Sequence, residues 1–318
     1  MGRYGADLTF LRPFYTCRYA QLSANIAAGA EMGVLAIDYR TTTWRQQDSG
    51  WPYPMEDTLA AAQWLRDNGA SKIFLTGDST GASQAIQTMI YNIEERKNVT
   101  IDGAVTFSAW TDFTCSSATY QYRRACDGWC TDIGEAVYKG NPAPIAYGGR
   151  SSANGYTAPK SIDDPRVNPW NANPFTLAKL PPLLLIVGSG EVLLGENLQF
   201  GQMVRAAGAI AQVEVWGGMW HDFQMATQGC GAGIMYEAVD ALQRAGQFFR
   251  GEGRCTQDCT ANCPRSSPVP VQFHYLHQQF PSWDGNGCNL PKEDWSAEFQ
   301  DPAPPQAPPV PQFMELRL

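Results

Sequence analysis

The residues best suited by type and spacing to carry out a reaction form the run Gly77-Asp78-Ser79-Thr80-Gly81. This run matches the pattern G-x-S-x-G, in which a serine lies on a sharp turn between a strand and a helix. An apolar run precedes it, and helix-compatible residues 82–94 follow it. Because Gly77 and Gly81 carry no Cβ, neighbouring chain segments can approach closely at such a turn. We therefore expect Ser79 to be a nucleophile; a plain strand–turn–helix connection is the alternative.

A serine hydroxyl needs a base to accept its proton and an acid to orient that base. The chain has three histidines, and two of them, His274 and His277, lie in a tail rich in Pro, Gln and Ser. The third, His221, follows a strand-like segment at residues 212–216, which is where open α/β sheets place their sites. We expect His221 to be the base; a surface histidine that caps the next segment is the alternative.

The acid is expected between the serine and the histidine in the sequence. Glu191 directly follows an apolar run at residues 183–188 that predicts a buried strand, so Glu191 is the first candidate. Asp222 is a competitor, but as the neighbour of His221 in sequence it should struggle to reach the ring. Glu196, the other competitor, is expected in the first turn of the next helix, where the helix dipole alone favours a carboxylate.

The helix that begins after Ser79 is expected to supply an oxyanion site. Backbone N–H groups at a helix N-terminus and the positive end of its dipole favour negative charge. We expect the backbone N–H of Thr80 to hold the oxyanion that forms when Ser79 attacks a carbonyl group. Asp78 should support the turn rather than take part in the chemistry.

Composition excludes several kinds of partner. The 318 residues are 44% hydrophobic, which is enough for a substantial core, and the formal net charge is −8. An acidic chain with no Lys/Arg-rich run is not expected to bind nucleic acid. No apolar stretch of about 18 residues predicts a membrane span, and residues 1–6 lack the apolar core of a secretory signal. We therefore expect a cytoplasmic location, and the sequence leaves the oligomeric state open.

The nine cysteines do not form a metal-binding pattern. Two groups recur at every fourth residue, namely Cys126 with Cys130, and Cys255 with Cys259 and Cys263. They lack the paired C-x-x-C spacing and the intervening histidine of zinc sites. Ordinary thiols or disulfides are therefore favoured, and we expect neither a metal nor an organic cofactor.

Short apolar runs alternate with helix-compatible segments over the first 250 residues. Strands are expected directly before Ser79 and at residues 34–38, 104–107, 183–188 and 212–216. Helices are expected at about 17–32, from 54 through 65, and at 82–94 and 234–249. Such alternation predicts an α/β fold with a mostly parallel, twisted sheet and helices on both faces.

Two regions break this alternation. Residues from about 111 to 180 are rich in Gly, Ser, Asn, Tyr and Pro and are too long for a simple connection, so we expect a cap- or lid-like insertion. Residues 251–318 are rich in Cys and Pro and should be a disordered tail. The expected organisation is thus one domain over residues 1–250, followed by the tail.

Several motifs in one order resemble the hormone-sensitive-lipase-like branch of the α/β-hydrolases, a group of carboxylesterases and lipases. They are Asp38-Tyr39-Arg40, Gly77-Asp78-Ser79-Thr80-Gly81, Ser108-Ala109-Trp110-Thr111-Asp112, Asp164-Pro165-Arg166-Val167-Asn168-Pro169, Leu180-Pro181-Pro182, Glu191-Val192-Leu193 and His221-Asp222-Phe223. The resemblance covers residues 20–250 and implies an α/β-hydrolase fold. It also implies hydrolysis of a small carboxylic ester through an acyl-enzyme, with Ser79, His221 and Glu191 as the triad. The branch usually has aspartate where this chain has Glu191.

One departure concerns the start of the sequence. The family carries a His-Gly-Gly-Gly segment before its Asp-Tyr-Arg strand, and this segment supplies much of the oxyanion hole. Here only Gly2 and Gly5 could correspond to it, so we expect an N-terminally truncated sequence with the first strands and the N-terminal cap missing. Two alternatives remain: a receptor-like member that binds a small molecule without turnover, and an amidase or arylformamidase.

Overall fold

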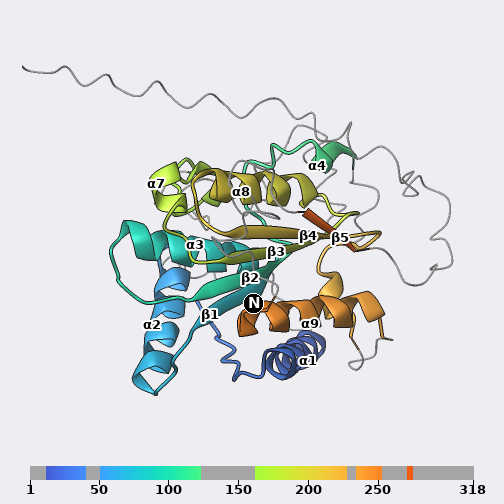
Figure 1. Cartoon of the computed structure of the whole chain (residues 1–318), viewed down its shortest axis with the longest axis horizontal. Coiled ribbons are helices and arrows are strands. Elements are labelled where there is room, and N and C mark those ends of the chain that lie inside the picture. The colour runs from blue at the N-terminus through green and yellow to red at the C-terminus, as the bar shows by residue number, and fades with distance from the viewer. Residues whose placement is uncertain (1–11, 41–50, 123–161, 228–233, 253–270, 275–318) are drawn as a thin grey trace, which may run out of the picture.

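The computed structural model describes residues 12–40, 51–122, 162–227, 234–252 and 271–274 (Figure 1). Their centre is a sheet of five parallel strands in the order β1-β2-β3-β4-β5. The strands are β1 (Phe74–Asp78), β2 (Gly103–Phe107), β3 (Leu183–Gly188), β4 (Ala211–Trp216) and β5 (Val271–His274). All carboxyl ends of these strands therefore lie at one edge of the sheet.

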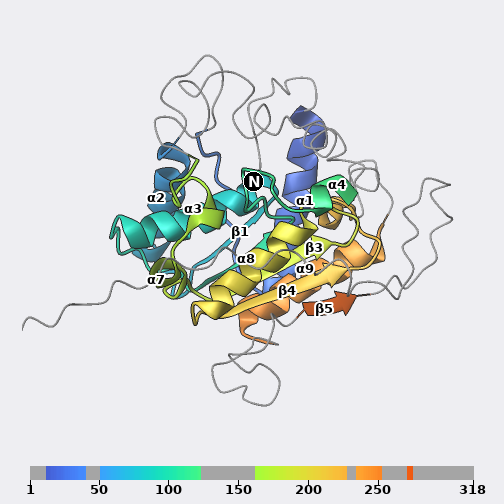
Figure 2. The same ribbon diagram turned by 90° about the horizontal axis from the view of Figure 1, so that it is seen from above.

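Helices cover both faces of the sheet, as the sequence predicts (Figures 1 and 2). On one face, α3 (Thr80–Glu94) and α8 (Leu194–Ala206) bury apolar side chains against β1, β3 and β4, and α2 (Tyr53–Asp67) and α7 (Pro174–Leu177) pack on α3. On the other face, α1 (Arg12–Ala30) and α9 (Tyr236–Arg250) pack together and against the sheet. The remaining elements are α4 (Thr119–Tyr122), η1 (Pro169–Asn171) and η2 (Phe223–Met225).

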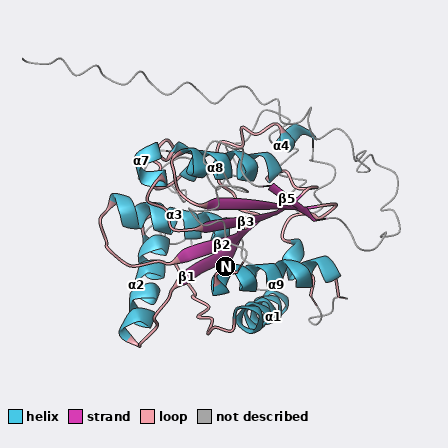
Figure 3. Cartoon of the chain, in the orientation of Figure 1, coloured by secondary structure: helices cyan, strands magenta, loops and turns pink. Residues whose placement is uncertain are grey.

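The alternation of side chains along the central strands explains the two layers. In β3, Leu183, Leu185 and Val187 belong to the core under α3 and α8, whereas Leu184 and Ile186 belong to the core under α1 and α9. Successive strand residues point to opposite faces, so a continuous apolar run is needed where both faces are covered. The sheet between its two helix layers is visible in Figure 3.

The strand expected at residues 34–38 is wrong. Residues 33–40 are neither helix nor strand, because an extended segment becomes a strand only when its backbone pairs with a neighbour. A cavity of about 680 Å³ is lined by Val34, Leu35 and Ile37 from this segment and by Leu75 and Thr76 from β1. The segment thus faces β1 across open space, and within the described residues β1 is the end strand of the sheet.

The prediction of a disordered tail from residue 251 is wrong at residues 271–274. Val271–His274 form β5, which pairs in parallel with β4. The alternating Val-x-Phe pattern suits a strand, and pairing satisfies backbone groups along an edge of β4 that would otherwise stay open. His274, dismissed as a tail residue, therefore lies in the sheet, while His277 lies outside the described residues. The domain boundary at residue 250 and the insertion at 111–180 stay predictions, and residues 123–161 of that insertion are not described.

Two further expectations concern membranes and cysteines. None of the helices in the described ranges is long and apolar enough to cross a membrane. Among the described cysteines, Cys17 on α1 is disulfide-bonded and Cys115 is a buried free thiol. Burial raises the pKa of Cys115 to about 12, so it stays protonated at neutral pH. The two groups of cysteines with four-residue spacing, at 126–130 and 255–263, lie outside the described residues.

Candidate active site

Ser79 lies on the turn between β1 and α3. Its backbone has φ +51° and ψ −118°, a positive φ that costs energy for a residue with a side chain and is concentrated at functional turns. A Cβ on Gly77 would come within 2.4 Å of the Gly81 backbone, so glycine is required for the chain to turn this sharply. The turn presents the Ser79 hydroxyl at the carboxyl edge of the sheet.

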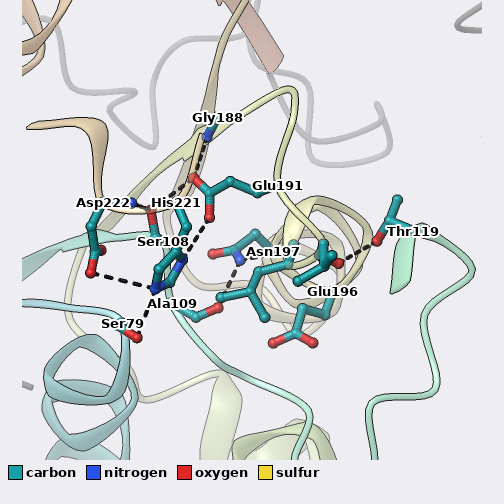
Figure 4. Close-up of polar contacts among 12 residues, drawn as sticks. Ser79, Ser108, Ala109, Thr119, Gly188, Glu191, Glu196, Asn197, His221 and Asp222 are labelled. Carbon is teal, nitrogen blue, oxygen red and sulfur yellow. Dashed lines mark hydrogen bonds and ion pairs between the residues drawn. The ribbon is translucent and has the colours of Figure 1, made fainter. Parts of the chain in front are cut away.

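The side chain of His221 lies between Ser79 and Glu191 (Figure 4). Its loop follows β4, and only 7% of the side chain is exposed. The Nε2 atom is 2.9 Å from Ser79 Oγ, and the Nδ1 atom is 3.1 Å from Glu191 Oε2. The structure therefore brings together three side chains that are 142 and 30 residues apart in the sequence.

Glu191 is fully buried at the end of β3. Its Oε1 atom accepts hydrogen bonds from the backbone N–H of Gly188 (2.6 Å) and from the hydroxyl of Ser108 (2.7 Å). A buried carboxylate needs such donors to offset its loss of water. With Oε1 held by two donors, Oε2 is left to face the ring of His221.

Asp222 does reach the ring of His221, contrary to the sequence-based expectation. Its Oδ2 atom is 3.4 Å from Nε2, because the backbone of Asp222 is left-handed (φ +58°) and turns the carboxyl group back toward the ring. Burial raises the pKa of Asp222 to about 8; the charge of His221 opposes this rise, and the charges of Asp78 and Glu191 add to it. Asp222 thus approaches Nε2, whereas Glu191 lies within hydrogen-bond distance of Nδ1.

Asp78 is anchored from the opposite helix layer. The hydroxyl of Tyr19, on α1, donates to Asp78 Oδ2 at 2.9 Å. Burial and the nearby charges of Asp78 and Asp222 raise the pKa of Tyr19 far above its usual value, so Tyr19 remains a hydrogen-bond donor. This contact agrees with a supporting role of Asp78 in the turn.

Glu196 lies in the first turn of α8, as expected. Its hydrogen-bond partners account for a carboxyl group at this position better than the helix dipole does. Its carboxyl group accepts hydrogen bonds from the backbone N–H groups of Thr111 and Asp112 and from the hydroxyl of Tyr120. Burial, followed by the charge of Asp112, raises the pKa of Glu196 well above its usual range. Glu196 thus ties the segment after β2 to α8 and does not contact the ring of His221.

Thr80 is the first residue of α3, so its N–H is one of the four that have no acceptor within the helix. It directly follows Ser79, and its role as an oxyanion donor stays a prediction. Among the described residues, no group of three His, Cys, Asp or Glu side chains could hold a metal ion.

Sequence reasoning missed two contributors, Ser108 and Tyr19. Ser108 could have been found, because it directly follows β2 and must lie at the same sheet edge as Ser79 and Glu191. Tyr19 could not have been found, because its contact with Asp78 depends on how α1 packs against the sheet.

Comparison with known proteins is consistent with this geometry. A family model described as alpha/beta hydrolase fold matches residues 15–225. The chain is 28% identical over 240 residues to an acetyl-hydrolase of Streptomyces hygroscopicus, covering 74% of the chain and 71% of that protein. It is 25% identical over 206 residues to an esterase of Acinetobacter venetianus, covering 64% of the chain but only 61% of that protein.

Solved structures point the same way. An esterase from the bacterial hormone-sensitive lipase family superposes with a TM-score of 0.59 at 27% identity, covering 74% of this chain and 70% of that one. The family model spans well over half of the sequence, and the motif order of the branch is kept. The chain therefore belongs to the α/β-hydrolase fold family, in its hormone-sensitive-lipase-like branch of esterases.

Proposed function

We propose that this chain hydrolyses carboxylic esters through an acyl-enzyme, with Ser79 as nucleophile, His221 as base and Glu191 as the orienting acid. The observation that carries the proposal is the continuous contact from Ser79 Oγ through both ring nitrogens of His221 to Glu191 Oε2, at 2.9 and 3.1 Å. Both distances are within hydrogen-bond reach. The similarity to an acetyl-hydrolase and to an esterase supports the substrate class.

The first half of the reaction follows from this geometry. As Ser79 Oγ attacks the ester carbonyl carbon, its proton passes to Nε2 of His221, and the carbonyl oxygen becomes an oxyanion. Glu191 accepts the Nδ1–H of the ring and stabilises the imidazolium that forms. The imidazolium then gives its proton to the alkoxide oxygen as the carbon–oxygen bond breaks, which leaves an acyl-enzyme and a free alcohol.

The second half repeats the same steps with water. His221 takes a proton from a water molecule, the resulting hydroxide oxygen bonds to the acyl carbon, and collapse of the intermediate returns the proton to Ser79 Oγ and releases the carboxylic acid. We assign to the N–H of Thr80, at the positive end of α3, the role of donor to the oxyanion in both halves.

Glutamate can fill the role that the branch usually gives to aspartate. Its extra methylene adds a rotatable bond, but two donors to Oε1 restrict the carboxylate of Glu191. Amide hydrolysis passes through the same kind of intermediate, so an amidase is the same proposal with another leaving group. A receptor that binds without turnover needs no activated serine, and the contact of Ser79 with His221 argues against it.

Labelling with an organophosphate tests the proposal. We expect one label per chain in the wild type and none in Ser79→Ala, because only an activated serine reacts. Ser83→Ala is the matched control: Ser83 lies on the next turn of α3, and its one hydroxyl proton can be donated to the backbone oxygen of either Ser79 or Trp110. That variant should be labelled as the wild type is.

Turnover of p-nitrophenyl acetate should fall by about a million-fold in Ser79→Ala and in His221→Ala, the loss typical of such residues. Labelling that persists in Ser79→Ala would exclude Ser79 as the nucleophile. Tight binding of a small ester with no turnover in the wild type would favour the receptor alternative instead.

A further inference from the structure

Ser108 is a buried serine in a strained backbone conformation at the centre of the site. It directly follows β2, which lies between β1 and β3 in the sheet, and its side chain is fully shielded from solvent. Its φ is +49°, which is uncommon for a residue with a side chain. Its own N–H donates to Ile186 O at 2.8 Å, so the backbone is held on the neighbouring strand.

The hydroxyl of Ser108 joins two loops. It donates to Glu191 Oε1 at 2.7 Å and accepts from the backbone N–H of Asp222 at 3.0 Å (Figure 4). Glu191 follows β3, whereas Asp222 is the neighbour of His221 in the loop after β4. One hydroxyl therefore touches both the residue that faces Nδ1 and the loop that carries the ring.

We propose that Ser108 is a positioning residue, whose hydroxyl orients the carboxylate of Glu191 and sets the distance between this carboxylate and the His221 loop. The inference rests on the proposed function and deepens it. The terminal torsion of a glutamate is broad, so an unanchored carboxylate samples many orientations. With Gly188 N and Ser108 Oγ on Oε1, the group is restricted to orientations in which Oε2 faces the ring.

A purely structural role makes a different prediction. If Ser108 only satisfied buried polar groups, its loss would lower stability and leave the turnover of the folded protein unchanged. If it positions Glu191, the turnover number falls in folded protein. Substrate affinity does not change, because the Ser108 hydroxyl contacts Glu191 and the His221 loop rather than Ser79.

The first test compares Ser108→Ala with Thr106→Val. Thr106 is as deeply buried, lies two residues earlier on β2, and directs its hydroxyl to Leu184 O at 3.4 Å rather than to Glu191 or His221. In Ser108→Ala we expect kcat for p-nitrophenyl acetate to fall about 10- to 100-fold, since a hydrogen bond to a charged group is lost, while KM changes less than twofold. Thr106→Val should keep both constants within twofold.

The pH profile supplies a readout that a structural role would not move. A carboxylate that has lost a donor takes up a proton more readily, so the acidic limb of the kcat/KM profile of Ser108→Ala should move to higher pH. If Ser108→Ala fails to fold, Ser108→Cys replaces it, because a thiol of similar shape is a weak donor and should give an intermediate loss. Unchanged kcat in the folded variant, or an equal loss in Thr106→Val, would overturn the proposal.

A double-mutant cycle with Glu191→Asp tests the coupling itself. Aspartate is one methylene shorter than Glu191, so we expect it to lose contact with either Ser108 or the ring, and Ser108→Ala should cost less than threefold in that background. The same loss in both backgrounds contradicts a role through Glu191. Failure of the proposed function is recognised separately: the wild type would then show neither turnover nor labelling of Ser79, and the positioning role would fall with it.

Discussion

Replacing Asp222 by asparagine tests how a buried carboxyl group beside the ring of His221 changes the free energy of unfolding with pH. The side chain is 15% exposed and its Oδ2 atom is 3.4 Å from Nε2. Burial raises the pKa of Asp222 from 3.8 to about 8. Asparagine has nearly the same shape, tolerates the left-handed backbone at this position, and cannot ionise. The variant therefore separates the effect of ionisation at position 222 from the effect of side-chain shape.

The sign of the effect follows from proton linkage. Between pH 3.8 and about pH 8 the folded protein holds a proton on Asp222 that the unfolded chain has released. The contribution of Asp222 to stability is thus fully present below pH 3.8 and is lost as the pH rises toward 8. The free energy of unfolding falls by at most about 1.4 kcal/mol per pH unit in this window.

Asp222→Asn should therefore match the wild type near pH 4 and exceed it in stability by up to about 4 kcal/mol at pH 7. Urea unfolding followed by tryptophan fluorescence at pH 4 to 8 measures the difference. A stability difference that is constant with pH, or a variant less stable than the wild type at pH 8, would refute the reasoning.

Asp57→Asn is the control with the opposite sign. Burial tends to raise the pKa of Asp57, but the hydrogen bonds and charge of Arg40 lower it overall. The stability that Asp57 contributes is present above its ordinary pKa and is lost as the pH falls. Asp57→Asn should thus be less stable than the wild type at neutral pH, with a difference that shrinks toward acidic pH.

Two other predictions concern packing around the site. Glu196→Ala leaves three buried donors, including the hydroxyl of Tyr120, without their acceptor, and should lower the free energy of unfolding by about 3 kcal/mol or more. Glu196→Gln keeps an acceptor oxygen and should cost clearly less; equal losses in urea unfolding would contradict this account. Gly77→Ala places a Cβ 2.4 Å from the Gly81 backbone and should abolish organophosphate labelling, whereas Gly33→Ala, with open space around its Cβ, should leave labelling intact. Normal labelling of Gly77→Ala would show that the turn can relax.

The arrangement of the site follows from the parallel sheet. The segments that follow β1, β2, β3 and β4 carry Ser79, Ser108, Glu191 and His221, and these four strands are neighbours in that order. Because parallel strands end at the same edge, residues that directly follow each strand converge there. Chemistry that needs several side chains in contact can thus be assembled from short segments that are far apart in the sequence.

The sequence alone determined the local features of this protein. The glycines around Ser79, the continuous apolar run of β3 and the helix after the serine are short-range patterns, and each predicted its element and the candidate residue beside it. Gly77 and Gly81 signal a turn because the steric reason lies within five residues. The same holds for Glu191, which directly follows its strand.

Only the tertiary structure decided features that depend on distant partners. Residues 34–38 have a strand-like pattern but no pairing partner among the described residues, whereas residues 271–274 pair with β4 despite their place in a tail-like sequence. Asp222 reaches the ring of His221 because its backbone is left-handed, and no sequence pattern predicts this conformation. Ser108 joins two loops only when β2, β3 and β4 are aligned in the sheet. Backbone pairing and loop conformation are set by contacts between segments far apart in the chain. A local sequence pattern does not predict these contacts.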